Sequence, residues 1–394
     1  MTTTTHSSDK IWNNPKFRAT FFQVFILAFI IVAAWMLFTT TTHNLQSRGI
    51  TSGFGFLKRA AGFEIPFTML PFDSSDSNGR VFWVGLLNTL IVSFLGIILA
   101  TTIGVIIGIA RLSKNWIVAR IATVYIETFR NIPLLLQIFF WYFAVLGALS
   151  PMRQAMKNGL FNDTVFLSNR GFTIPKPVFE PMAIAILIVF IIALIATFFY
   201  RRYAIRKQEQ TGLQLPVLRV AAALIIGLPL LTAFLTGLPI SLDYPEAGRF
   251  NFVGGMTIIP EFLALLFALS IYTGAFIAEI VRSGINSVSH GQTEAAYSLA
   301  IKPSYTLRLV IIPQALRVII PPLASQYLNL AKNSSLAAAI AYPELVSVFT
   351  GTVLNNSGQA LECVAITMIA YLSISLSIAA FMNWYNKRIE LVER

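Results

Sequence analysis

Charged residues are scarce in this chain: Lys, Arg, Asp and Glu make up only 12% of its 394 residues. Soluble domains carry about 25% charged residues, so the deficit excludes a water-soluble core of comparable size. The single cysteine, Cys363, excludes a disulfide framework and a cysteine-based metal site. The three histidines lie far apart in the sequence and suggest no common site.

The sequence also lacks a phosphate-binding loop of the G-x-x-x-x-G-K-[ST] type. If ATP powers this protein, a separate chain must therefore hydrolyse it. Neither a metal-ligand set nor a nucleophile–base pair is apparent, which argues against a membrane-embedded enzyme. We expect no catalytic residue, no metal site and no cofactor bound by this chain.

Long apolar runs are what the sequence does contain, and hydrophobic residues make up 56% of it. A bilayer core needs about 20 apolar residues per helix, and runs without strand-like alternation favour helices as the spanning structure. We therefore predict an all-α, polytopic membrane protein with about eight transmembrane helices. The expected spans are 20–40, 82–110, 120–149, 181–200, 220–240, 259–283, 318–340 and 362–384.

The net charge of +12 comes from Lys and Arg in the segments between the apolar runs. About twice as many lie on one side as on the other, most clearly in residues 201–208 (RRYAIRKQ), which predicts that both termini are cytoplasmic. No basic patch alternates with polar helix faces, so nucleic-acid binding is not expected. The predicted domains are a cytoplasmic tail over 1–19 and a single transmembrane domain over 20–390. Its long periplasmic loops, at 41–81 and 150–180, are either contact surfaces for an external partner or plain connectors.

Two patterns concern helix shape. Gly96, Ala100, Gly104 and Gly108 recur every four residues, which predicts close packing against a neighbouring helix. Pro133 is expected to end or bend the third span. Both patterns describe packing and carry little functional information.

The segment 286–317 is polar enough to leave the membrane. Ser289 or Thr293 is placed to cap a short helix, Pro303 should break it, and a second short helix is expected to end at Ile312, before Pro313. A helix–turn–helix on the cytoplasmic face suits the docking of another protein. An ordinary amphipathic loop remains the alternative at this point.

This segment resembles the cytoplasmic signature of ABC-importer permeases, which is Glu-Ala-Ala, three residues, Gly, nine residues, Ile, any residue, Leu-Pro. The chain matches at Glu294, Ala295, Ala296 and Pro313, and it has Ala300 where the family has glycine. Since alanine accepts a positive φ poorly, either the turn has moved towards Pro303 or this coupling helix differs slightly. The resemblance implies a type I importer fold and a coupling function for Gly291, Glu294, Ala295, Ala296, Ala300 and Pro313.

Further segments resemble the polar amino acid branch of that family, across roughly 82–149 and 259–390. They begin at Tyr125, Gly274, Pro313 and Lys332, and the enlarged segment 150–258 is similar to the larger permease of general L-amino acid importers. The resemblance implies an inner-membrane subunit that pairs with a second permease, forming a heterodimer in the enlarged members. It also implies two ATPase subunits, which hold the ATP and Mg²⁺, and a periplasmic amino-acid-binding protein.

Ionisable residues in or beside the spans form the second candidate site, because charge in a membrane is costly and indicates function. Lys332 is expected to line the substrate pathway, and Arg130 either lines it or pairs with Glu127. Glu279 and Arg282 are expected to hold the coupling segment. The candidate pathway residues are Arg130, Gln137, Lys332, Asn333, Ser334 and Ser335; the candidate structural ion pairs involve Glu127, Glu279 and Arg282.

Together these expectations describe a permease subunit that moves polar L-amino acids across the bacterial inner membrane by alternating access. The alternative is an ion-coupled secondary transporter, which would show inverted repeats and acidic residues deep in its spans. No repeat is evident in the sequence, and such a carrier would have no use for the Glu294 segment.

Overall fold

The computed structural model describes residues 15–47, 53–157, 159–161, 163–249 and 251–389. Most of the predicted cytoplasmic tail, residues 1–14, lies outside the described residues. Seven helices of the described chain are long and apolar enough to cross a membrane, and eight if one bent helix pair counts as a single span. The chain therefore has the predicted helical, polytopic architecture.

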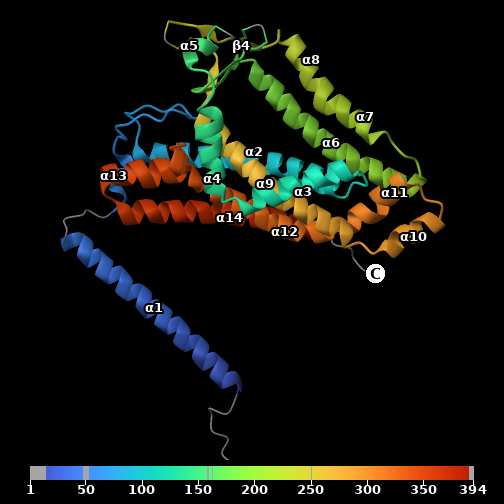
Figure 1. Ribbon diagram of the computed structural model, residues 1–394, viewed down its shortest axis with the longest axis horizontal. Helices are drawn as coiled ribbons and strands as arrows, with labels where there is room; N and C mark the ends of the chain where they lie inside the picture. Colours follow the sequence, from blue (N-terminus) through green and yellow to red (C-terminus); the bar gives the residue numbers. More distant parts are fainter. Residues whose placement is uncertain (1–14, 48–52, 158, 162, 250, 390–394) are drawn as a thin grey trace, which may run out of the picture. The chain divides into compact units, whose positions relative to one another are not determined.

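The chain divides into two compact units: residues up to 91 together with 343–388, and residues 92–342 together with the C-terminal end. The first unit holds α1 (Pro15–Ser47), η2 (Phe54–Lys58), η7 (Val346–Val353), α13 (Leu354–Ser357) and α14 (Ala360–Ile389). Helix α2 (Asn78–Arg111) begins in this unit and continues into the second (Figure 1).

The core of the first unit forms where the start of α2 packs on η7 and α14. Val84 and Phe349 are fully buried there. Gly85 allows this packing, because a Cβ on it would lie 2.9 Å from the Cα of Leu345. The outer loop before α2 is held by hydrogen bonds, and the pKa of Asp73 is lowered because its carboxylate accepts from the Ser75 backbone N–H.

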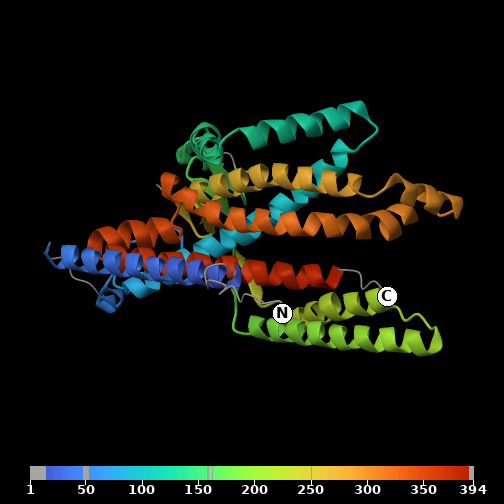
Figure 2. The ribbon, with the colours of Figure 1, turned by 90° about the horizontal axis from the view of Figure 1, so that it is seen from below.

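The second unit is built around α9 (Pro260–Asn286), which packs against α3 (Trp116–Asn131), α4 (Leu134–Phe139), η3 (Phe140–Leu146) and α12 (Ile312–Asn333). Figure 2 shows α9 and α12 side by side along their length. The predicted small-residue stripe lies against this bundle: a Cβ on Gly104 would lie 2.5 Å from the Ile277 side chain, and one on Gly108 2.7 Å from the Ala278 carbonyl oxygen. The stripe is therefore a packing surface, as predicted.

The predicted third span, 120–149, is broken rather than continuous. Helix α3 ends at Asn131, and α4 starts at Leu134 after a bend of 106°. Ile132 is extended, with φ −94° and ψ 128°, because the ring of a following proline disfavours helical backbone. Pro133 therefore sets the break, as the sequence predicted.

An inserted hairpin extends from this bundle. It consists of α6 (Ala183–Thr211) and a returning limb formed by α7 (Val217–Ala222), η4 (Ala223–Gly227) and α8 (Leu228–Leu235). Figures 1 and 2 show its turn at the same end of the second unit as α10 (His290–Ser298), with the strands at its other end.

Short strands at the outer end of the hairpin were not predicted. In this region α5 (Met152–Ala155) is followed by antiparallel pairings of β2 (Gly171–Ile174) with β1 (Phe166–Ser168) and β7 (Met256–Ile258). Two ribbons join β3 (Lys176–Phe179) to β4 (Ile240–Asp243) and β5 (Glu246–Ala247) to β6 (Phe252–Val253). The 150–180 loop is therefore half of a small β-structure whose other half follows the hairpin.

Candidate functional site

In the predicted coupling segment, 286–317, three residues separate the end of α9 from the start of α10. Helix α10 has Ser289 at its N-cap, but the Ser289 side chain makes no capping hydrogen bond. Glu294 is exposed and faces His290 one turn earlier, with 3.1 Å between Oε1 and Nδ1. Ala296 is buried, whereas Ala295 is exposed. Among the described residues, the Glu294 side chain is exposed and forms an ion pair only with His290.

The turn after α10 shows which residue takes the left-handed conformation at the position where the family has glycine. Ala300 itself takes the left-handed conformation, with φ 56°. Its N–H donates to Tyr297 O at 2.9 Å, and the Ile301 N–H donates to Ala296 O at 3.1 Å. These two bonds form a Schellman motif, which usually places glycine at the left-handed residue. The turn has therefore not moved, and an alanine carries the strain.

Beyond this turn the chain stays helical for longer than predicted. The segments α11 (Pro303–Thr306), η5 (Leu307–Ile311) and α12 follow one another, and Pro313 lies in the first turn of α12. The second short helix was predicted to end at Ile312. That prediction is wrong, because the chain passes through the wide π-helical turn η5 into α12 without leaving helical backbone, so Pro313 does not end the helix.

A charge network joins α2, α3 and α9. Arg111 contacts Glu279 through a hydrogen-bonded ion pair and also lies 3.8 Å from Glu127. Glu279 in turn binds Arg282, with 2.6 Å between Oε1 and Nη2. The structure thus places the predicted Glu279–Arg282 pair together, and Glu127 faces Arg111 rather than Arg130.

Arg111 was not predicted to belong to the site. The sequence feature that could have indicated it is its position as the last residue of a long span, where a charged side chain needs a partner from another helix.

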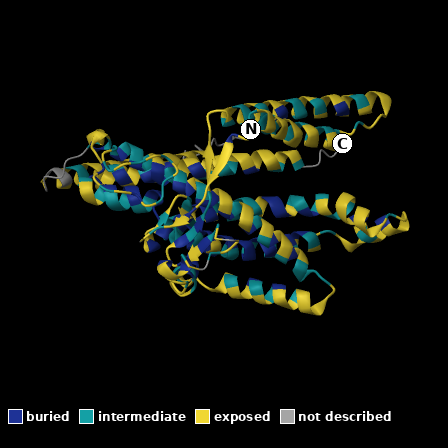
Figure 3. Ribbon diagram, turned by 90° about the horizontal axis from the view of Figure 1, so that it is seen from above, coloured by how far each residue is buried: buried dark blue, intermediate teal, exposed yellow. Residues whose placement is uncertain are grey.

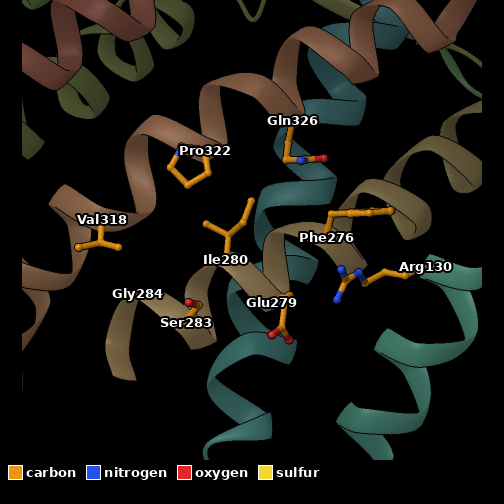
Figure 4. Close-up of a pocket in the computed structure, with 9 residues that line it drawn as sticks. All are labelled: Arg130, Phe276, Glu279, Ile280, Ser283, Gly284, Val318, Pro322 and Gln326. Atoms are coloured by element: carbon orange, nitrogen blue, oxygen red, sulfur yellow. The ribbon is translucent and has the colours of Figure 1, made fainter. Parts of the chain in front are cut away.

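Arg130 lines a cavity of about 400 Å³ with α9 and α12. Figure 4 shows its side chain directed towards Glu279, with Gln326 and Pro322 on the opposite wall. Its guanidinium carbon lies 5.1 Å from the centre of the Phe276 ring. The cavity is therefore lined by a cation, by the amide of Gln326 and by the carboxylate of Glu279, which is paired with Arg111 and Arg282.

The Gln137 side chain hydrogen-bonds the backbone at the break between α3 and α4 instead of lining a cavity. It is buried, and its Nε2 donates to Phe129 O and Ile132 O, both at 2.9 Å. These carbonyls lie at the end of α3 and lack helical partners because the helix stops there. We therefore assign Gln137 to the structure of the bend.

Lys332 lies at the end of α12, where the chain tightens into the 3₁₀ segment η6 (Ser334–Ile340). Its side chain is exposed, and it makes no ion pair with the described residues. Ser334 is buried with its hydroxyl bonded to Ala331 O, and the Ser335 hydroxyl bonds Lys332 O. Of the predicted polar run, Lys332 and the half-buried Asn333 remain available to a substrate.

Glu344 has a structural setting. Its carboxylate is fully buried and accepts from the N–H groups of Val346 and Ser347, both at 2.7 Å, and from the Tyr371 hydroxyl at 2.9 Å. It therefore links the start of η7 to α14.

A second carboxylate, Glu261, was not predicted from the sequence to have a role. It accepts a hydrogen bond from the Tyr142 hydroxyl at 2.9 Å.

No group of three or more His, Cys, Asp or Glu side chains within the described ranges is placed to hold a metal ion. The polar groups that the structure brings together instead form the network around Glu279 and the cavity beside Arg130.

Comparison with known proteins identifies similar sequences over nearly the whole length. The family model described as "Binding-protein-dependent transport system inner membrane component" matches residues 210–391. The chain is 53% identical to the putative amino-acid ABC transporter permease YhdX of Escherichia coli, over 97% of this chain and 96% of that protein. It is 49% identical to the general L-amino acid transport system permease AapQ of Rhizobium johnstonii, over 97% and 94%. It is 43% identical to the glutamate/glutamine/aspartate/asparagine transport system permease BztB of Rhodobacter capsulatus, over 97% and 96%.

Proposed function

Because the chain belongs to the family of amino-acid ABC transporter permeases, we propose that it forms the membrane pathway of an importer for polar L-amino acids, powered by ATP that a separate chain hydrolyses. The names of the relatives AapQ and BztB support this class of substrate. The ion-coupled alternative is not favoured, because the similar proteins are ABC permeases.

The observation that carries the proposal is the exposed helix α10 at the inner end of the bundle. A polar helix with Glu294 turned away from the rest of the chain can bind an ATPase subunit without disturbing the membrane helices. The side chain of Glu294 is 71% exposed, so a basic group of the ATPase can reach it. We place Gly291, Ala295 and Pro313 in the same coupling segment, on either side of Glu294.

For the substrate we propose two contact points on α12. Gln326 faces the cavity beside Arg130, and Lys332 lies nearly two helical turns further along. A zwitterionic substrate needs a cation for its carboxylate and an acceptor for its ammonium group. Arg130 and Lys332 supply the cations, and the amide oxygens of Gln326 and Asn333 supply acceptors.

We propose that a second, non-identical permease covers Lys332. Its ammonium group is exposed on a single chain at the end of a membrane-spanning helix, and such a charge faces a protein interior or a water-filled space. A second permease would close that space. The large size of this chain supports a heterodimer, with both termini cytoplasmic as the distribution of Lys and Arg indicates. A binding protein would deliver the substrate from outside.

Two variants of α10 test the coupling. In the reconstituted importer, Glu294→Lys should abolish substrate-stimulated ATP hydrolysis because it repels the proposed basic partner. The matched variant His290→Ala removes only the contact within the helix and should leave hydrolysis nearly intact. Equal losses in both variants would assign Glu294 to the helix itself and defeat the coupling assignment.

The substrate contact is tested separately by uptake. Lys332→Ala should lower uptake or change the preference between acidic and neutral amino acids, and Lys332→Arg should retain more activity because the charge remains. Unchanged rate and preference in Lys332→Ala would show that this residue does not meet the substrate.

A further inference from the structure

The inner end of the inserted hairpin carries a group of cations without acidic partners. We call this group the basic collar, and it comprises Arg201, Arg202, Arg206, Lys207 and Arg219. Within the described part of the chain, none of the five forms an ion pair. Over 183–235 the only acidic residue is Glu209. By contrast, Arg111 and Arg282 at the end of the bundle share the carboxylate of Glu279.

Aromatic rings support the cations of the collar. The guanidinium carbon of Arg202 lies 4.8 Å from the centre of the Phe198 ring, and Nζ of Lys207 lies 5.7 Å from the centre of the Tyr203 ring. Phe198 and Tyr203 are themselves exposed. Exposed aromatic residues beside cations at the end of an apolar run mark the level of the lipid headgroups. The collar therefore lies where phosphate groups are found.

The exposure of the apolar residues in the rest of the hairpin indicates what surrounds the hairpin. In the most apolar stretch of α6, 6% of the residues are buried. The corresponding share is 0% in the returning limb and 67% in α9. Figure 3 shows the contrast, with α9 largely dark and the hairpin largely yellow. The 29 residues of α6 measure about 43 Å, which exceeds the bilayer core of about 30 Å. Its last turns therefore reach the headgroups while the apolar part lies in the lipid tails.

We propose that the basic collar binds the phosphate groups of anionic phospholipids and thereby fixes the hairpin in the bilayer. Arg202 and Arg206 are four residues apart, so both guanidinium groups can meet one headgroup from the same face of α6. Guanidinium groups pair with phosphate through two parallel hydrogen bonds. The apolar surface of α6 would hold the acyl chains directly above the collar. The proposal does not depend on the substrate or on the ATPase.

Native mass spectrometry of the purified complete transporter tests the proposal, with cardiolipin or phosphatidylcholine added in detergent. Wild type should retain cardiolipin in preference to phosphatidylcholine. The double variant Arg202→Gln/Arg206→Gln should bind cardiolipin about 10- to 30-fold more weakly, since each cation near a membrane surface contributes about three- to five-fold and the double variant removes two. The control Arg153→Gln/Lys176→Gln removes two exposed cations from the opposite end of the hairpin and should bind as wild type does.

The variant Arg202→Lys/Arg206→Lys keeps both positive charges but loses the paired hydrogen bonds of the guanidinium groups, so it should bind cardiolipin more weakly than wild type and more tightly than the Gln variant. Equal losses in the Lys and Gln variants, or equal losses in the control, would overturn the proposal. It would also be overturned if the Gln variant held cardiolipin normally but lost the ATPase subunits during purification, because the collar would then belong to a protein interface.

Discussion

Ala300 offers a direct test of the coupling turn, because its backbone conformation suits a different residue. With φ 56°, Ala300 is left-handed, and this conformation costs an L-residue roughly 1–2 kcal/mol. Glycine avoids that cost but has more freedom when the turn opens, which offsets about 0.4–1 kcal/mol. We therefore expect Ala300→Gly to stabilise the turn by about 0.5–1 kcal/mol.

Hydrogen exchange of the assembled transporter measures this change locally. The N–H groups of residue 300 and Ile301 close the turn onto Tyr297 and Ala296, so they exchange only when the turn opens. A gain of about 0.5–1 kcal/mol corresponds to exchange about two- to five-fold slower at these two amides. Amides in the middle of α9 should be unaffected, because they do not depend on this turn.

A glycine-to-alanine substitution in α10, the helix before the turn, provides a matched comparison. Gly291 is helical, and a Cβ on it would lie 3.6 Å from the Ser289 hydroxyl oxygen, which is an ordinary contact. Gly291→Ala should therefore also stabilise α10, by about 0.5 kcal/mol. Conformation, not the residue type alone, sets the sign in each case. Faster exchange at residues 300 and 301 in Ala300→Gly would refute the reasoning.

Two pairs of substitutions test the roles of the carboxylates Glu344 and Glu279. Glu344→Ala removes the acceptor of three hydrogen bonds and should destabilise the protein by about 2–4 kcal/mol, whereas Tyr371→Phe removes one donor and should cost about 1 kcal/mol; equal melting temperatures of the two variants would contradict the assignment. Glu279→Gln should cost about 1–2 kcal/mol because Arg111 loses its close partner, and Glu127→Gln, at an exposed pair 3.8 Å apart, should cost less than about 0.5 kcal/mol. Thermal unfolding in detergent measures both pairs of variants, and an equal loss in the last two would show that the network is not centred on Glu279.

The sequence predicts those features of the fold that depend on nearby residues. Apolar runs locate the spans, Pro133 locates the break, and Gly104 and Gly108 identify the face of α2 that meets α9. The β-structure was not predictable in this way, since β2 pairs with β7 across the whole inserted hairpin and each strand is only three or four residues long. Such short strands are defined by their partners and show little pattern of their own.

In the candidate site, too, contacts between residues close in sequence were predictable and contacts between distant residues were not. The Glu279–Arg282 pair could be expected because the two residues are three positions apart on one helix. The contact of Arg111 with Glu279 joins residues 168 positions apart, and no local pattern indicates it. Gln137 was predicted to line the pathway, and in the structure its Nε2 donates to the carbonyls that the helix break exposes, while its Oε1 has no hydrogen-bond partner among the described residues. Its function depended on the geometry of the bend.

Helix α9 links the features that a coupling mechanism needs. Its C-terminal part holds Glu279 and leads through three residues into α10, while its N-terminal end holds Glu261 against Tyr142. Five residues beyond Glu279, a Cβ on Gly284 would lie 2.3 Å from the Ile319 side chain, so α9 and α12 pack too closely to slide independently. Packed helices shift as units because close-packed interiors resist continuous deformation. A displacement of α10 by an ATPase would therefore move α9 and α12 together, and with them both walls of the cavity beside Arg130.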